Sequence, residues 1–281
     1  MSTLFVEQLT VIDCAFLDAK RGIVGESWIV DVELEGELDD QSMVFDFGEV
    51  KKKLKRAIDG GADHKLIVPL KSPVLDLKRS ETTVGLFFRG ASGAIEHHSP
   101  ASAVCGVNAE QVNAQTLSAH LLPAVRKQVP ANVARIGLSL RNEPIDGAYY
   151  HYTHGLKKHA GHCQRIAHGH RSRLEIRVGG ERAPKREQDW AAAWRDVYLG
   201  TAGDLVGHQD GRLRFAYKSS EGDFELEMPE ERCDLLTVDS TVERIAEHIA
   251  ERVAGEWPGR EVEVRAYEGV MKGALARRRI G

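Results

Sequence analysis

Long apolar runs and a basic field are both missing from this sequence. Nowhere do about 18 apolar residues follow one another without a charge, as a membrane-spanning helix would require. The formal net charge is -4 at pH 7, so no global positive field is available for nucleic acid or an anionic membrane surface. The first residues lack the basic segment and apolar core of an export signal. We therefore expect a cytoplasmic protein that binds neither nucleic acid nor membrane.

Cysteine is scarce as well. The chain has four cysteines and none of them forms a C-x-x-C pair: Cys14, Cys105, Cys163 and Cys233. Such scattering does not suit a disulfide framework and is typical of reduced thiols in a reducing compartment. One of these thiols could be reactive, which its surroundings must decide.

Periodicity predicts a mixture of strands and surface helices in the first half. Alternating apolar residues indicate strands, and apolar residues three and four apart indicate helices with one buried face. Asp46 is the predicted N-cap of the first helix, and Pro123 should kink the second. The predicted elements are strands over 5–13 and 28–34, a helix over 46–58, a possible strand over 83–89, a helix over 113–127, and strands over 133–141 and 147–153.

The same pattern then starts again. VGESWIVDVELEGE, beginning at Val24, aligns with HGHRSRLEIRVGGE, which begins 144 positions later at His168. Gly25 meets Gly169 in this alignment, and the apolar even-numbered residues Val30, Val32 and Leu34 meet the apolar residues Leu174, Ile176 and Val178. The chain is therefore predicted to be two diverged copies of one domain.

The ends of the halves repeat too, since EPIDGA from Glu143 resembles EGVMKGA from Glu268. We place the two copies at residues 1–146 and 147–281. The second copy has its own predicted elements: a helix face of Trp190, Trp194 and Val197, a hairpin over 212–228, and a helix that begins with a capping box of Ser240 and Glu243.

Histidine is concentrated where the second copy begins, with six of the twelve between positions 151 and 170. Residues two apart in a strand share a face, so His168 and His170 project together. His154, on the preceding strand, can reach them across a hairpin. Three histidines with an open position are a ligand set of catalytic zinc. An isolated His-x-His pattern is more often a pair of hydrogen-bonded surface rings, and the third histidine in the paired strand makes the two interpretations equal.

Other reactive residue types lie close by in the sequence. Cys163 stands five residues before His168, where cationic surroundings would favour its thiolate, although a lone cysteine is also compatible with a structural role. Asp63 and His64 are adjacent, which by itself indicates only helix capping. The nearby arginines alternate away from the histidine face and either form a solvated edge or hold phosphates near a metal: Arg165, Arg171 and Arg173.

Four segments match motifs of one known family: CQRIAHGH from Cys163 with upstream His154, MVFDFGEVKKKL from Met43 followed by ADHKLIV from Ala62, STVERIA from Ser240, and VRAYEGVMKGA from Val264. They resemble, in turn, the zinc and nucleophile motif, the DF-x-x-LK helix with its Asp-His motif, a later helix, and the terminal strand pair of the pyruvoyl- and carboxy-tetrahydropterin synthases. The resemblance covers most of both halves.

The resemblance implies an α+β tunnelling fold. Each copy would have an antiparallel four-stranded sheet with helices on one face, and several subunits would form a barrel with active sites between units. We therefore expect a homo-oligomer of two or three tandem chains. The implied function is that of a zinc-dependent lyase, a 6-carboxy-5,6,7,8-tetrahydropterin synthase acting on 7,8-dihydroneopterin triphosphate in the queuosine (deazapurine) pathway. A 6-pyruvoyl-tetrahydropterin synthase is the alternative, and so is an inactive homologue that binds a pterin.

The resemblance also implies roles for individual residues. Zn²⁺ would be bound by three histidines, Cys163 would act as the base, and Asp63 and His64 would be a proton-handling pair. Substrate-binding residues would include Arg165 and a pterin-anchoring glutamate. For that anchor Glu268 is in phase with the inward face of its strand, whereas Glu143 is out of phase. The implied zinc ligands are His154, His168 and His170.

Each copy lacks what the other has kept. In the first half Val24, Gly25 and Glu26 stand where the second has His-Gly-His, so we expect no zinc there. The second half has no Asp-His pair. The two halves are therefore predicted to build a single composite site in each chain.

Overall fold

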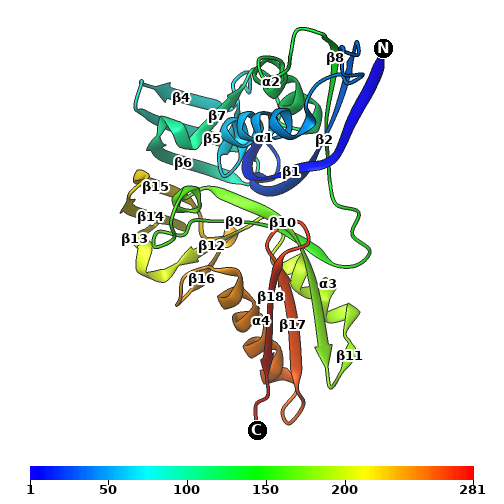
Figure 1. The fold of residues 1–281 in the computed structure, drawn as a ribbon. Coiled ribbons are helices and arrows are strands. Elements are labelled where there is room, and N and C mark those ends of the chain that lie inside the picture. The colour runs from blue at the N-terminus through cyan, green and yellow to red at the C-terminus, as the bar shows by residue number, and fades with distance from the viewer.

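The computed structural model describes residues 1–281, and the two halves of the chain repeat one order of elements (Figure 1). The first half contains β1 (Ser2–Asp18), β2 (Gly22–Gly36), α1 (Phe47–Ala62), β3 (Leu66–Pro69), β4 (Leu75–Arg79), β5 (Thr83–Gly90), β6 (Gly93–Pro100), β7 (Val104–Val107), α2 (Ala114–Arg126) and β8 (Val133–Arg141). A short 3₁₀ helix, Ala101–Ala103, precedes β7.

The second half contains β9 (Tyr149–His154), β10 (His168–Val178), β11 (Glu181–Arg182), α3 (Pro184–Ala193), β12 (Val197–Thr201), β13 (Leu205–Gln209), β14 (Arg212–Ser219), β15 (Gly222–Pro229), β16 (Cys233–Leu236), α4 (Val242–Glu256), β17 (Val262–Tyr267) and β18 (Gly273–Arg278). Its 3₁₀ helices are His162–Gln164, Ala202–Asp204 and Glu230–Arg232. No helix in the structure is long and apolar enough to cross a membrane.

Each half has a main sheet with the same strand order. The first is β7-β3-β1-β2-β8, and the second is β16-β12-β9-β10-β17-β18 with β11 attached to β10. The predicted α+β class is confirmed, but the four-stranded antiparallel sheets of the prediction are too small. A helix follows each hairpin and returns the chain to the same edge, so β3 pairs with β1, and β12 with β9, in parallel.

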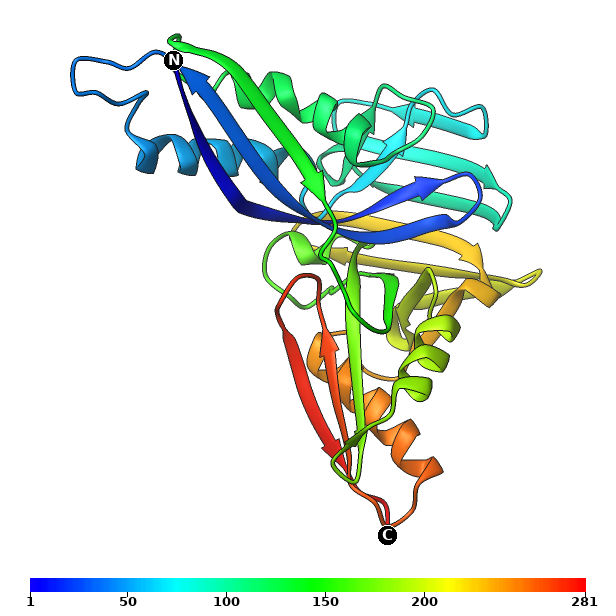
Figure 2. The ribbon, with the colours of Figure 1, turned by 90° about the vertical axis from the view of Figure 1, so that its right-hand side faces the viewer.

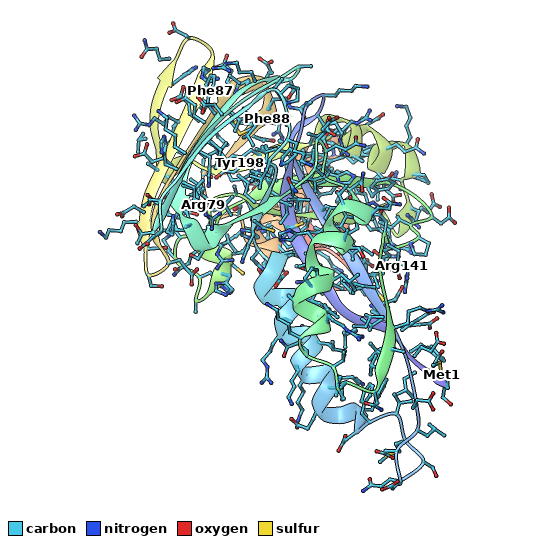
Figure 3. All side chains as sticks on the ribbon, turned by 90° about the horizontal axis from the view of Figure 1, so that it is seen from above. Met1, Arg79, Phe87, Phe88, Arg141 and Tyr198 are labelled. Carbon is cyan, nitrogen blue, oxygen red and sulfur yellow. The ribbon has the colours of Figure 1, made fainter.

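A third sheet belongs to both halves. Its order is β13-β14-β15-β6-β5-β4, and its central pair is antiparallel β6 and β15. The core beneath it also draws on both halves and includes Phe88 of β5 and Tyr198 of β12. Figure 3 labels both residues, with Met1 at the opposite end of the molecule. The halves therefore share a core, and the domain boundary after residue 146 stays a prediction.

The hairpin β1–β2 crosses the hairpin β9–β10 backbone against backbone. A Cβ atom added to Gly25 would lie 1.9 Å from the carbonyl oxygen of Tyr152, and one added to Gly169 would lie 2.8 Å from the Cα of Gly25. Beyond the crossing, the hairpin arms of the two halves diverge (Figure 2). The aligned glycines of the repeat are thus the point where the two hairpins touch.

The helix starts test the capping predictions. Asp46 caps α1 by accepting a hydrogen bond from the amide of Gly48, as predicted. The predicted capping box of Ser240 and Glu243 is wrong: α4 begins at Val242, and its N-cap makes no side-chain hydrogen bond. Ser240 is one residue too early, and its hydroxyl and carbonyl oxygens lie beside a histidine ring instead.

Most predicted strands are present, some of them longer than predicted. The segments 5–13 and 28–34 are parts of β1 and β2, and 83–89 is part of β5. Val197, predicted on a helix face with Trp190 and Trp194, instead opens β12. The chain leaves α3 through Asp196, whose φ of 57° ends the helical path.

Candidate functional site

Three histidines meet at the end of the β9–β10 hairpin where the connecting loop leaves β9 and enters β10. His154 ends β9 and pairs with His168, the first residue of β10, and His170 follows two residues later on the same face. Their exposed fractions are at most 1%. One ligand atom from each ring lies within 4.8 Å of the others. The predicted histidines are thus brought together.

The outer nitrogens of two of these rings have hydrogen-bond partners, whereas Nδ1 of His170 has none and only lies 3.2 Å from Asp13 Oδ1. His154 Nδ1 lies 3.0 Å from the carbonyl oxygen of Ser240, and His168 Nδ1 lies 2.9 Å from that of Arg165. A carbonyl oxygen only accepts, so each Nδ1 carries the proton. The Nε2 atoms are then unprotonated in the neutral rings, which is the state that a metal requires.

The inner side of the cluster fits a cation. Nε2 of His154 and Nε2 of His170 are buried without any hydrogen-bond partner, an arrangement that costs free energy unless something binds them. Burial lowers the pKa of His154 and of His168 well below the ordinary value. Three clustered imidazoles, two of them with an unpartnered Nε2, are a suitable donor set for Zn²⁺.

The Asp-His pair of the first half lies against this cluster. Asp63 follows α1, where its Oδ1 accepts from the amide of Asp13 (2.9 Å) and its Oδ2 lies 2.8 Å from His64 Nδ1. The His64 ring centroid is 5.0 Å from that of His168. Ligand atoms of His64, Cys163 and His168 lie within 4.8 Å of one another. The structure thus joins residues of both halves within one chain.

The electrostatics of the pair favour a charged imidazole. Burial opposes the charge on His64, but hydrogen bonds to Asp63 and to Cys163 outweigh it and raise the pKa of His64 to about 10. A protonated His64 beside Cys163 would stabilise the thiolate of that cysteine. The two groups together can hold and release a proton.

Arg165 clamps the turn that carries His64. Its side chain is buried, and its Nη1 lies 3.4 Å from the carbonyl oxygens of both Asp63 and His64. Its Nη2 is 3.3 Å from Glu221 Oε2. These bonds hold the two halves together at the site, and a contact of Arg165 with substrate stays a prediction.

The two candidate anchoring glutamates lie in different places. Glu268, in the β17–β18 turn, has Oε2 4.0 Å from Lys272 Nζ, which is itself 3.2 Å from Asp13 Oδ2 near the histidines. Glu143 accepts from Arg171 through its carbonyl oxygen, and its own Oε2 is buried without a partner. Of the two, only Glu268 has a carboxylate that is connected through Lys272 and Asp13 to the histidine cluster.

Glu143 belongs with the first-half counterpart of the site. There Glu26 stands at the alignment position of His170 and accepts from the Ser27 amide (2.9 Å) and from Asn142 (3.0 Å). Burial raises the pKa of Glu26 to about 7. A buried carboxyl group thus takes the place of the imidazole.

Sequence reasoning missed Asp13. This acid is 3% exposed within the apolar strand β1, and it lies beside His170 and Lys272. A buried acid between the apolar residues Ile12 and Cys14 was the available signal, because such groups are rarely buried without a partner. The sequence could not say that the partners lie in the other half.

The larger surface hollows lie away from this chemistry. One of about 470 Å³ is on the outer side of β4–β6, and another of about 470 Å³ is on β13–β15. None of the residues of the histidine cluster lines either hollow. Side-chain chemistry, not concavity, therefore identifies the candidate site within one chain.

Comparison with known proteins adds a family. A family model described as 6-pyruvoyl tetrahydropterin synthase matches twice, at residues 18–139 and 146–278. Among curated proteins no match was found. Two solved structures are similar, each over 50% of this chain. The 6-pyruvoyl tetrahydropterin synthase of Plasmodium falciparum is 19% identical over 90% of its length with a TM-score of 0.41, and that of Plasmodium vivax is 20% identical over 98% with 0.33.

Proposed function

This chain belongs to the 6-pyruvoyl tetrahydropterin synthase family as a tandem of two family domains, and on that premise we propose that it is a zinc-dependent tetrahydropterin synthase with one composite active site per chain. A single observation carries the proposal. His64 of the first half and Cys163 of the second half meet beside the buried histidine cluster of the same chain. Neither half contains all of these groups.

The metal would be held by the three imidazoles. Nε2 of His154 and Nε2 of His170 have no protein partner, and the Nδ1 atoms of His154 and His168 donate to carbonyl oxygens that fix the tautomer. Zn²⁺ bound there would supply Lewis acidity toward the side-chain oxygens of a bound pterin. The proposed ligands are His154, His168 and His170.

Cys163 and His64 would move the protons. Sγ of Cys163 takes a proton from a substrate carbon next to a hydroxyl group, and Nε2 of His64 donates one. Asp63 holds Nδ1 of His64 at 2.8 Å, which leaves Nε2 free to face Cys163. The proposed reaction takes up water and converts 7,8-dihydroneopterin triphosphate to 6-carboxy-5,6,7,8-tetrahydropterin, on the queuosine pathway, while triphosphate and the other two side-chain carbons leave, the latter as acetaldehyde.

Glu268 is the proposed anchor of the pterin ring. Its carboxylate can accept hydrogen bonds from the ring N–H groups, and its turn is tied to the site because Gly269 donates to Ser172 Oγ (3.2 Å) and Lys272 reaches Asp13. The free thiols of the chain suit the reducing conditions of the cytoplasm, where we place the activity.

Unpaired sheet edges support assembly of several chains. The main sheets end at β8 and at β18, and such edges offer backbone groups to another strand. Leu275, on β18, is 42% exposed. We propose a homo-oligomer of two or three chains, and light scattering that shows a strict monomer would contradict it.

The composite site is tested by substitutions in each half. His64→Ala and Cys163→Ala should each lower turnover of dihydroneopterin triphosphate by about 10² to 10⁴ while zinc content stays at the wild-type level. The double variant should be little worse than the poorer single one, because groups in one mechanism are not additive. His162→Ala is the matched control, since this exposed neighbour of Cys163 bonds only to Glu221.

Mass spectrometry of the product separates the possible outcomes. A 6-carboxy product supports the proposal, and a 6-pyruvoyl product would assign the chain to the other reaction of the family. Pterin binding without turnover would identify a binding homologue. Normal turnover by His64→Ala alongside an inactive Cys163→Ala would make the first half a scaffold and would refute the composite site.

A further inference from the structure

A buried carboxylate of the first half reaches into the histidine cluster of the second. Asp13 Oδ1 accepts from Ser27 Oγ at 2.5 Å and lies 3.2 Å from Nδ1 of His170. Its Oδ2 lies 3.2 Å from Nζ of Lys272. The carboxylate is 5% exposed, and a charge so deeply buried is strongly unfavourable unless it is paired.

The backbone of the same residue holds the Asp-His pair. The amide of Asp13 donates to Asp63 Oδ1 at 2.9 Å, and its carbonyl oxygen accepts from the amide of His64 at 2.7 Å. His64 adopts a left-handed backbone with φ 53°, which is uncommon outside glycine. One residue therefore contacts both parts of the composite site.

We propose that Asp13 is a positioning residue of the metal centre, which orients His170 from its Nδ1 side and keeps the ring's other nitrogen directed into the cluster. This role rests on the metal centre proposed above. Carbonyl oxygens of the same half serve His154 and His168 through hydrogen bonds. His170 Nδ1 makes no hydrogen bond, and the Asp13 carboxylate of the other half, 3.2 Å away, is its nearest charged partner. Such outer partners fix the tautomer of a ligand histidine and raise its basicity.

Lys272 makes the buried carboxylate tolerable. Its ammonium group balances the charge of Asp13, so the buried carboxylate is not left as an uncompensated charge. Lys272 lies in the same turn as Glu268. The pairing therefore also ties the proposed pterin anchor to the metal centre.

The first half repeats this contact with the residue types exchanged. Cys14 pairs with Glu26 in β1–β2, and Tyr152 pairs with His170 in β9–β10. Cys14 and Tyr152 therefore occupy equivalent positions, and so do the residues before them, Asp13 and His151. His151 Nδ1 lies 2.7 Å from the carbonyl oxygen of Gly25 and 4.0 Å from Glu26 Oε2. The crossing of the hairpins thus brings an acid and an imidazole near each other on both sides, but only Asp13 and His170 are in close contact.

Zinc affinity tests the proposal without any need for substrate. Asp13→Asn keeps the shape of the side chain and an acceptor for Ser27 but removes the charge. Competition with a chelator should show zinc affinity about 10- to 100-fold weaker, as for other outer-shell losses. Asp59→Asn is the matched control, because this acid of α1 bonds to Thr10 and Lys55, away from the cluster.

Two further readouts separate positioning from mere stability. Bound Co²⁺ should give a shifted visible spectrum in Asp13→Asn and an unchanged one in Asp59→Asn. Without metal, Asp13→Asn and wild type should have similar melting temperatures. Adding zinc should raise the melting temperature of Asp13→Asn less than that of wild type. If Asp13→Asn does not fold, Ser27→Ala, which releases Oδ1, should weaken zinc binding about fivefold, the effect of one lost hydrogen bond.

The outcomes distinguish this role from the metal centre itself. Wild-type protein that binds no zinc would overturn the centre and this role with it. The role of Asp13 alone would be overturned by a different result. In that case wild type binds zinc, and Asp13→Asn has a zinc affinity within about twofold of the wild-type value and gives the same Co²⁺ spectrum.

Discussion

Replacing Gly25 with alanine should push the two halves apart at the place where the composite site is assembled. The added Cβ would lie 1.9 Å from the carbonyl oxygen of Tyr152 and 2.7 Å from the amide nitrogen of His170. Ordinary contact begins near 3.4 Å, so the strands must separate by about 1.5 Å. Both obstacles are backbone atoms of paired strands, which no change of rotamer can relieve.

The cost follows from that geometry. Overpacking of a core costs typically about 1 to 3 kcal/mol, and a clash between backbones belongs at the upper end of that range. At about 2 to 4 °C per kcal/mol for a chain of this size, the melting temperature should fall by about 6 to 12 °C. The displaced amide belongs to His170, so zinc affinity should fall too, since ligand geometry tolerates only about 0.5 Å.

Thermal melting and metal analysis measure both effects. Gly255→Ala is the matched control, because nothing lies within 4 Å of its added Cβ in α4. Removing a helical glycine should stabilise the protein by about 0.5 to 1 kcal/mol. A Gly25→Ala protein that melts like wild type and keeps its zinc would show that the hairpins do not cross at this glycine.

Further outcomes are expected at named positions. Elemental analysis should find one zinc per chain and none in His168→Ala, and two per chain would contradict the single composite site. Glu268→Gln should raise KM for the pterin substrate and Glu143→Gln should not. Equal changes in KM in the two variants would contradict the proposal that Glu268 anchors the pterin. Burial raises the pKa of Glu26 to about 7 from 4.5, so its protonated form stabilises the fold below about pH 4.5, and this contribution is lost as the pH rises through 7. Glu26→Gln should remove that pH dependence, so its free energy of unfolding, measured with denaturant at pH 8, should exceed that of wild type by about 3 kcal/mol. Parallel profiles of unfolding free energy against pH for the two proteins would refute this prediction.

The sequence alone determined the local features. The N-cap at Asp46 and the strand over 133–141 were correct because each depends on residues a few positions apart. The histidine cluster was predictable for the same reason. His168 and His170 are two residues apart in one strand, and His154 is their neighbour in a hairpin, so period and register suffice to bring the rings together.

Only the tertiary structure decided which distant segments meet. The pairing of β6 with β15 joins residues more than 120 positions apart, and it places a third sheet across both halves. The contact of Asp13 with His170 depends on the crossing at Gly25, and Ser240 lies beside His154 instead of capping α4. Periodicity specifies which face of a strand is buried, but not which other face covers it. That choice is made by the packing of the whole chain, because it depends on the combined burial of both halves.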